Sequence, residues 1–294
     1  MSDRPEPADL LSLALDVARE AGELLVRGRA GDVAAEATKS SPTDIVTALD
    51  RASEELVARR LREARPDDGL LGEEGSDTVS RSGVRWIVDP LDGTVNFLYR
   101  LPNWAVSIAA ELDGEIVAGV VHAPALGVTY TAARGAGAFR LPPDLPPDLP
   151  PALPPALPAG AAAGPAAGEP LTGSTVTDLA SALVATGFGY AARRRAAQAA
   201  VLTRVVPKVR DIRRMGAASL DICAAAAGMV DAYYERGLKP WDHAAAGLVA
   251  AEAGLRVGGL DGRPPGEDLV VVAPPALFDQ LTALLAEEPR ADRD

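Results

Sequence analysis

Apolar positions recur with helical spacing near the start of the chain. Leucine and alanine at positions 10, 11, 14, 15, 18, 24 and 25 are interspersed with charged residues, which predicts an amphipathic helix from residue 8 to about residue 29. A second helix is expected from about residue 47 to residue 65, where Pro66 ends it. The turn-rich stretch between them, residues 39–44, is typical of a loop.

From residue 85 to residue 133 the pattern favours strands. Residues 85–88 form a short apolar run that Asp89-Pro90 is expected to end, and a helical turn is expected from Thr94 onward. Three β-rich segments follow, at 105–112, 115–122 and 128–133. The Asp113-Gly114 pair between the first two is a strong hairpin signal, so these segments predict an antiparallel meander.

A Pro- and Ala-rich repeat at 141–170 interrupts this pattern and is typical of a flexible, polyproline-like insertion. A docking peptide for a proline-recognising partner is the alternative interpretation. Beyond it, strands and helices alternate, which predicts an α/β arrangement. The expected strands are 182–186, 211–213, 232–235 and 269–272, and the expected helices are 193–206, 219–227, 242–253 and 275–286.

Three parts of the chain are therefore predicted. An α+β lobe covers residues 1–140, the insertion covers 141–170, and an α/β lobe covers 171–294. A site is expected where the two lobes meet, because ligand sites favour such junctions.

The charge and composition exclude several classes of protein. A net charge of -12 and a pI near 4.7 work against binding to nucleic acid or to anionic membranes. Cys223 is the only cysteine, so neither an intrachain disulfide nor a thiolate zinc site is expected. The first residues lack the order of a secretion signal, and no apolar run is long enough to span a bilayer. We therefore expect a cytoplasmic protein.

Two carboxylates follow the apolar run, in the segment Trp86-Ile-Val-Asp89-Pro-Leu-Asp92-Gly-Thr94. Hard cations such as Mg²⁺ prefer oxygen ligands, so Asp89, Asp92 and the carbonyl of Leu91 are candidate ligands. Taken alone, Asp-Gly-Thr is better explained as a turn with a threonine helix cap.

Two further segments favour the metal site: Gly72-Glu73-Glu74-Gly75 upstream and Lys239-Pro-Trp241-Asp242-His243 downstream. In this order, the three segments resemble the signatures of the inositol monophosphatase family. Segments 39–50 and 231–235 resemble the family's N-terminal and substrate-facing segments, so the resemblance covers nearly the whole chain except the insertion. It implies a layered α-β-α-β-α sandwich of the inositol monophosphatase and fructose-1,6-bisphosphatase type, with α+β and α/β parts.

The resemblance also implies a site for two Mg²⁺ ions, with room for a third, looser ion. Glu73, Asp89 and the carbonyl of Leu91 would bind the first ion, and Asp89, Asp92 and Asp242 the second. Such an ion pair suits the attack of a metal-bound water on phosphorus.

Roles for nearby residues follow from the same resemblance. Thr94, hydrogen-bonded to Asp50, would orient the attacking water, and Glu73 would act from the other side. Lys39 would steady the local charge.

The substrate would be bound by two groups of residues. The backbone N–H groups of Gly93 and Thr94 would face its phosphate. The turn Gly216-Ala217-Ala218 and Glu235 would contact its hydroxyl groups, so Glu235 is the candidate for substrate selectivity.

The expected function is hydrolysis of inositol monophosphate or a similar polyol or sugar phosphate. Ala217 replaces a common threonine of the family, and Lys239-Pro240 is also found in histidinol-phosphate phosphatases. Phosphatases of histidinol phosphate, fructose 1,6-bisphosphate or 3'-phosphoadenosine phosphate are therefore alternatives, and a non-catalytic regulatory binding protein is an alternative of another class. Lithium sensitivity and a homodimer are implied by the resemblance.

Several other residues receive a structural interpretation. His243 is expected to cap or pack the helix start, because magnesium prefers oxygen ligands. The basic residues at 193–195 and 208–214 are interpreted as a solvated face or a subunit contact, with attraction of an anionic substrate as the alternative.

Overall fold

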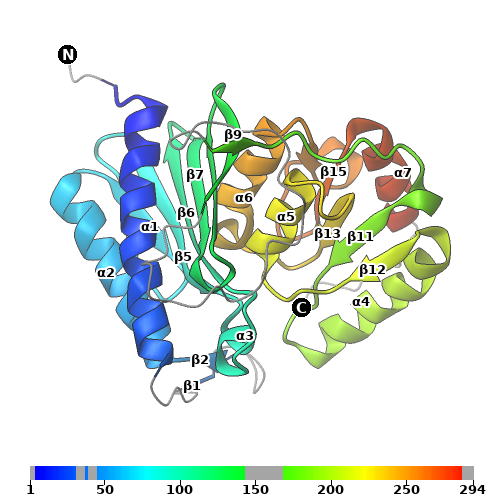
Figure 1. Cartoon of the computed structure of the whole chain (residues 1–294), viewed down its shortest axis with the longest axis horizontal. Helices are drawn as coiled ribbons and strands as arrows, with labels where there is room; N and C mark the ends of the chain where they lie inside the picture. The colour runs from blue at the N-terminus through cyan, green and yellow to red at the C-terminus, as the bar shows by residue number, and fades with distance from the viewer. Residues whose placement is uncertain (1–3, 31–36, 39–44, 143–167, 287–294) are drawn as a thin grey trace.

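The structure is a computed structural model that describes residues 4–30, 37–38, 45–142 and 168–286. Its helices and sheets alternate in layers, α-β-α-β-α (Figure 1). Helices α1 and α2 cover one face of a large sheet, α5 and α6 lie between the large and the small sheet, and α4 and α7 cover the outer face of the small sheet. The predicted layered fold class is confirmed.

The two helices of the first layer form where the apolar pattern predicts them. Helix α1 spans Pro7–Arg29 and buries its apolar face: Leu10, Ala14, Val17, Ala18, Ala21 and Leu25. Helix α2 spans Ala48–Ala64 and begins with a capping box, in which the Thr47 N–H donates to Asp50 Oδ2 at 2.9 Å.

The large sheet has eight strands in the order β10-β9-β8-β7-β6-β5-β3-β4. Their bounds are β3 Gly69–Gly72, β4 Asp77–Thr78, β5 Val84–Asp92, β6 Ala105–Leu112, β7 Glu115–Ala123, β8 Val128–Ala133, β9 Gly137–Leu141 and β10 Glu169–Pro170. The predicted antiparallel meander is confirmed in β6, β7 and β8. At its first turn Asp113 and Gly114 both have positive φ angles, 53° and 86°, as the primed hairpin turns require.

The prediction that Asp89-Pro90 ends the strand was wrong, because β5 continues to Asp92. The pairing with β6 is regular up to Asp89, shifts register, and resumes at Asp92. Pro90 lacks an N–H and cannot donate to the ladder, which fits an irregularity inside a strand that continues. The short strand β3 was not predicted.

The small sheet has five strands in the order β12-β11-β13-β15-β14. Their bounds are β11 Leu183–Thr186, β12 Asp211–Arg213, β13 Ala232–Glu235, β14 Arg256–Gly258 and β15 Val270–Ala273. The alternation with helices is confirmed, with α4 at Ala192–Val205, α5 at Ala218–Ala226, α6 at Pro240–Glu252 and α7 at Pro275–Ala286. The sheet is mixed, since β15 runs antiparallel to both of its neighbours.

A two-stranded sheet, β1 at Ala37–Thr38 and β2 at Ile45–Val46, and the short helix α3 at Thr94–Leu98 complete these elements. Residues 143–167 of the predicted insertion lie outside the described residues, while its last two residues, Glu169 and Pro170 in β10, pair with Arg140 and Phe139 of β9, just before the insertion. The division into two lobes stays a prediction. No helix in the described ranges is long and apolar enough to cross a membrane.

The middle helix layer packs closely against the large sheet. Helices α5 and α6 are rich in buried alanine, so their backbones can approach the sheets. A Cβ added at Gly119 of β7 would lie 2.8 Å from the carbonyl oxygen of Ala245 in α6. Strand β7 therefore contacts the backbone of α6 directly at Gly119.

We expect Gly119→Ala to lower the free energy of unfolding by about 1–3 kcal/mol, because the added methyl group meets backbone that cannot rotate away. The matched control is Gly247→Ala in the middle of α6, where the new Cβ would lie at an ordinary 3.7 Å from Val257. That change should raise stability by up to about 1 kcal/mol, since glycine disfavours a helix interior. Urea unfolding of both variants measures the difference, and equal effects would contradict this packing.

Candidate active site

Glu73 and Asp89 meet because two neighbouring strands run parallel. Strand β3 pairs with β5 so that Gly72 lies opposite Val88, and both strands end at the same edge. The Glu73 N–H donates to the Val88 carbonyl oxygen at 3.2 Å, which continues the ladder by one residue. Parallel pairing therefore brings the first carboxylate beside the second, although they are separated in sequence.

Asp242 comes to the same edge from the other half of the chain. It lies in the first turn of α6, where its Oδ2 accepts a hydrogen bond from the Lys239 N–H at 2.6 Å. Ser107 lies opposite Asp89 in the sheet, and its hydroxyl donates to the Trp241 carbonyl oxygen at 3.3 Å. This bond holds the start of α6 over the end of β5.

The carboxylates are close enough to perturb one another. Burial raises the pKa of Asp89 well above its usual range, and the negative charges of three neighbours raise it further: Glu73, Asp92 and Asp242. Burial also raises the pKa of Asp92 to about 6 and that of Asp242 well above its usual range. The structure thus gathers the four predicted acidic ligands at one edge of the large sheet.

The chemical type of these side chains fits magnesium, because all four are carboxylates and Mg²⁺ prefers oxygen ligands. No group of three or more His, Cys, Asp or Glu side chains in the described ranges is placed to hold a metal. Glu73 and Asp89 instead share a side-chain hydrogen bond. Two carboxylates in contact need a proton or a cation between them, and a divalent ion would cancel the negative charge of this pair.

Thr94 lies beside this cluster and makes the predicted contact with Asp50. Its Oγ1 is 3.0 Å from Asp50 Oδ1 and 3.1 Å from the Leu91 carbonyl oxygen, so the hydroxyl hydrogen can point to either. Asp50 and Thr94 are buried, and burial raises the pKa of Asp50. The roles predicted for both residues stay predictions.

Gly93 allows two distant turns to touch. Its φ angle of 89° is left-handed, and a Cβ at this position would lie 2.8 Å from the Asn103 carbonyl oxygen and 3.2 Å from Ala217 Cβ. Any other residue would strain the backbone and push these neighbours apart. Glycine therefore keeps the turn before α3 against the predicted substrate-binding turn, Gly216-Ala217-Ala218.

Asp92 joins this turn to the carboxylate cluster. Its Oδ1 accepts from the Ala218 N–H at 3.2 Å, and its Oδ2 accepts from Ser219 twice, from the N–H at 2.8 Å and from the hydroxyl at 2.5 Å. Ser219 was not predicted as a site residue. A serine at the start of a predicted helix is a visible signal, but its partner lies 127 positions away in sequence.

Glu235 ends β13 and lies within electrostatic reach of the cluster. Burial raises its pKa to about 7, while the hydrogen bond from the Tyr233 hydroxyl, at 2.6 Å to Oε2, and the charges of Arg214 and Arg194 oppose the shift. A Cβ at Gly187 would lie 1.8 Å from Glu235 Oε2, so only glycine leaves room for this carboxylate.

Asp221 is a second residue that the sequence did not reveal. It lies in α5 with 1% exposure, and its Oδ1 has no hydrogen-bond partner in the described part of the chain. The Gly216 N–H donates to its carboxyl group, which ties Asp221 to the predicted substrate-binding turn. Burial raises the pKa of Asp221 well above its usual range, and the charges of Asp92 and Glu235 add to the shift.

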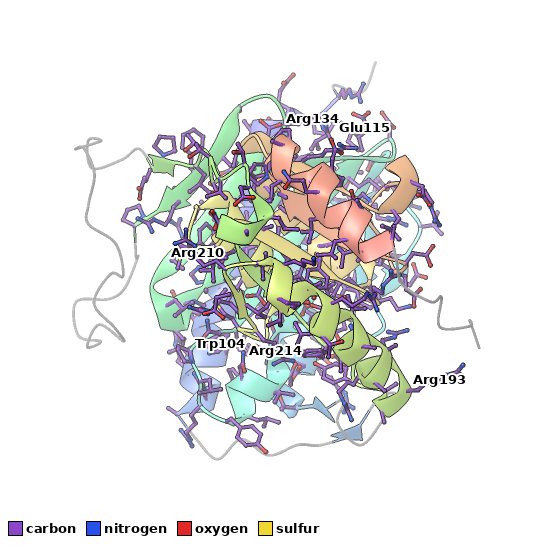
Figure 2. All side chains as sticks on the ribbon, turned by 90° about the vertical axis from the view of Figure 1, so that its right-hand side faces the viewer. Trp104, Glu115, Arg134, Arg193, Arg210 and Arg214 are labelled. Atoms are coloured by element: carbon purple, nitrogen blue, oxygen red, sulfur yellow. The ribbon has the colours of Figure 1, made fainter. Side chains whose placement is uncertain are left out.

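The other residues that the sequence analysis singled out lie outside the carboxylate cluster or outside the described residues. Lys39 lies outside the described residues. His243 is half-buried beside Asp242, and burial lowers its pKa to about 4, so it stays neutral and has no electrostatic role at neutral pH. Figure 2 shows Arg193, Arg210 and Arg214 spread over one side of the molecule, which favours a solvated surface over a single anion site.

Neither of the two described cavities is lined by the four carboxylates. A pocket of about 350 Å³ lies between the end of α2, strand β4 and the first residues of β3 and β5, away from the strand ends that carry the carboxylates. A cavity of about 10 Å³ is lined in part by Gly187, Gln198 and Glu235, and is close to the size of one water molecule. We place the candidate site at the carboxylate cluster, because its side chains match the chemistry and the larger pocket's do not.

The buried Asp221 should give stability a pH dependence. Its pKa is raised in the folded state, so its favourable contribution is full below about pH 4 and is lost as pH rises towards the raised value. Asp221→Asn has no such proton, so the variant should gain stability relative to the wild type as pH rises from about 5 to about 8. Urea unfolding across this range measures the difference, and a constant difference would contradict the shift.

The comparisons with known proteins agree with this geometry. The model of the inositol monophosphatase family matches residues 6–290. Inositol-1-monophosphatase SuhB of Mycobacterium tuberculosis is 43% identical over 296 residues, covering 95% of this chain and 94% of the relative. The Nus factor SuhB of Escherichia coli is 34% identical over 247 residues, covering 83% of each chain.

Solved structures show the same fold. Mycobacterium tuberculosis SuhB superposes with a TM-score of 0.75 at 40% identity, covering 96% of this chain and 97% of that chain. An IMPase of Thermotoga maritima has a TM-score of 0.78 at 28% identity, covering 95% and 97%. The predicted resemblance and the predicted enzyme class, a phosphatase, are thereby confirmed at the level of the family. On its sequence and its fold, this chain belongs to the inositol monophosphatase family.

Proposed function

We propose that the protein is a magnesium-dependent phosphomonoesterase that hydrolyses inositol monophosphate or a similar polyol or sugar phosphate. The observation that carries the proposal is the cluster of Glu73, Asp89, Asp92 and Asp242, in which Asp89 and Asp92 are buried and neighbouring negative charges add to the rise of the pKa of Asp89 and of Asp242. Relatives named inositol-1-monophosphatase support the substrate class.

Each carboxylate would have a defined ligand role. Glu73, Asp89 and the Leu91 carbonyl would hold one Mg²⁺, and Asp89, Asp92 and Asp242 would hold a second, with a third, looser ion near Glu73. When bound, such ions lower the pKa of a coordinated water and stabilise the entering and leaving oxygens of phosphoryl transfer.

Asp50 and Thr94 would handle the proton of the attacking water. Asp50 Oδ2 accepts from Thr47, so Oδ1 is the oxygen that faces Thr94. If the Thr94 hydroxyl donates to Asp50, its own oxygen can accept a hydrogen bond from a water in the site. Thr94 would thus orient the water and relay its proton, and Asp50, with its raised pKa, would receive that proton.

The substrate would lie between α3, α5 and β13. The backbone N–H groups of Gly93 and Thr94 would meet its phosphate, and Gly216-Ala217-Ala218 its ring hydroxyls. Glu235 Oε2 accepts from Tyr233, which leaves Oε1 for a substrate hydroxyl. A pKa near 7 lets this group donate or accept a hydrogen bond.

The other phosphatase activities of the superfamily share the same cluster and would differ at the substrate end, near Glu235 and Lys239. Relatives named Nus factor SuhB support the alternative of a non-catalytic regulatory binding protein, but the carboxylate cluster favours catalysis. A homodimer, a cytoplasmic location and the absence of nucleic-acid and membrane partners stay predictions.

Wild-type protein with Mg²⁺ should release inorganic phosphate from at least one substrate of a panel with inositol, fructose, histidinol and adenosine phosphates. Asp89→Asn should lower kcat/KM more than about 100-fold, because this carboxylate would bind both ions. Asp67→Asn, at an exposed surface ion pair, is the matched control and should keep full activity. A colorimetric phosphate assay measures the rates, and lithium should lower them. Release of phosphate from no member of the panel would refute the enzyme proposal.

Glu235→Gln should separate recognition of the polyol from the chemistry at phosphorus. The variant should lose about 10- to 100-fold in kcat/KM for inositol monophosphate, the size of one charged hydrogen bond, and much less for p-nitrophenyl phosphate. The pH profile of kcat/KM for this variant, measured from about pH 6 to about pH 8, should also lose the titration of Glu235 near pH 7. Equal losses for both substrates would show that Glu235 does not contact the polyol.

A further inference from the structure

Hydrogen bonds from its own chain fix the orientation of the Asp92 carboxylate. Both of its oxygens are hydrogen-bonded to the first turn of α5, which belongs to the other half of the chain. The shortest of these bonds comes from the hydroxyl of Ser219, a side chain with 0% exposure.

The two oxygens of Asp92 are not equivalent. A carboxylate has about four lone-pair sites, two on each oxygen. Oδ2 accepts from the Ser219 N–H at 2.8 Å and from the Ser219 hydroxyl at 2.5 Å, so both of its sites are used. Among the described residues, Oδ1 accepts only the longer bond from the Ala218 N–H, at 3.2 Å, which leaves one of its sites open.

We infer that the Ser219 hydroxyl restricts Asp92 to coordination through Oδ1 alone and thereby favours Mg²⁺ over Ca²⁺ at this site. The inference rests on the proposed function, because it takes Asp92 as a metal ligand. Ser219 is a positioning residue in this scheme, since it acts on the ion only through Asp92.

The selectivity follows from the coordination chemistry of the two ions. Mg²⁺ takes six oxygens in a strict octahedron, with one oxygen from each carboxylate. Ca²⁺ takes six to eight oxygens and readily accepts both oxygens of one carboxylate. A carboxylate with one open oxygen suits Mg²⁺, and one that can turn and offer both oxygens suits Ca²⁺.

Ser219→Ala tests the inference, because it removes the hydroxyl and keeps both backbone donors. Calorimetric titration of the substrate-free protein with Mg²⁺ and with Ca²⁺ measures the ratio of the two affinities. We expect the preference for Mg²⁺ to fall about tenfold or more, the size of effect typical of groups that orient a metal ligand. Ser219→Thr, which restores a hydroxyl, should recover the wild-type ratio.

Ser174→Ala is the matched control, since the Ser174 hydroxyl donates to Asp231 at the same distance of 2.5 Å and neither residue belongs to the cluster. It should leave the ratio unchanged. Thermal unfolding checks that each variant is folded. If Ser219→Ala does not fold, Ser219→Cys, with its weaker donor, should still lower the ratio.

The outcomes separate this inference from the proposed function. If the wild type binds Mg²⁺ and Ser219→Ala keeps the wild-type ratio, the role of Ser219 is refuted while the metal site stands. If the wild type binds neither ion, both are refuted. A fall in the ratio that Ser174→Ala does not share supports the inference.

Discussion

The electrostatic repulsion within one buried cluster of carboxylates is the constraint on which the candidate site depends. Burial raises the pKa of Asp89, Asp92 and Asp242, and the negative charges of neighbouring carboxylates add to the rise, so ionising the whole cluster is costly. The cost is tolerated because β3, β5 and α6 are fixed by a much larger apolar core. Binding of a positively charged ligand at the cluster would therefore stabilise the folded state.

Two helix starts help to offset the repulsion. The first turn of α5 donates two backbone N–H groups to Asp92, and the start of α6 donates the Lys239 N–H to Asp242. Helix N-termini carry a partial positive charge that favours nearby anions. Both helices lie between the two sheets, and their alanine-rich surfaces allow β7 to approach α6 at Gly119. The packing that forms the middle layer thus also places the donors that hold the acidic side chains.

The local pattern of the sequence was enough for the long elements and for the acidic residues. Helix α1 and the meander follow from periodicity and from the Asp113-Gly114 turn, which are properties of neighbouring residues. Strand β3 was missed because two leucines between glycines give too short a signal, and β5 was cut short because Pro90 usually ends a strand. Ser219 could not be found from spacing, since its partner Asp92 comes from a distant segment, and the burial of Asp221, whose Oδ1 has no partner among the described atoms, is set by tertiary packing.

Asp92 would take part in both proposed roles of the candidate site, metal binding and substrate binding. Its position at the end of β5 puts it among the acidic ligands, and its bonds to Ala218 and Ser219 put it under the turn proposed to bind the substrate. Asp221 accepts a hydrogen bond from the Gly216 N–H of the same turn, and the charge of Glu235 helps to raise the pKa of Asp221. A shift of Asp92 on ion binding would therefore move the start of α5 and the turn before it. If Asp92 and this turn have the proposed roles, ion binding and substrate recognition would be coupled through this one carboxylate, because the same hydrogen bonds would serve both.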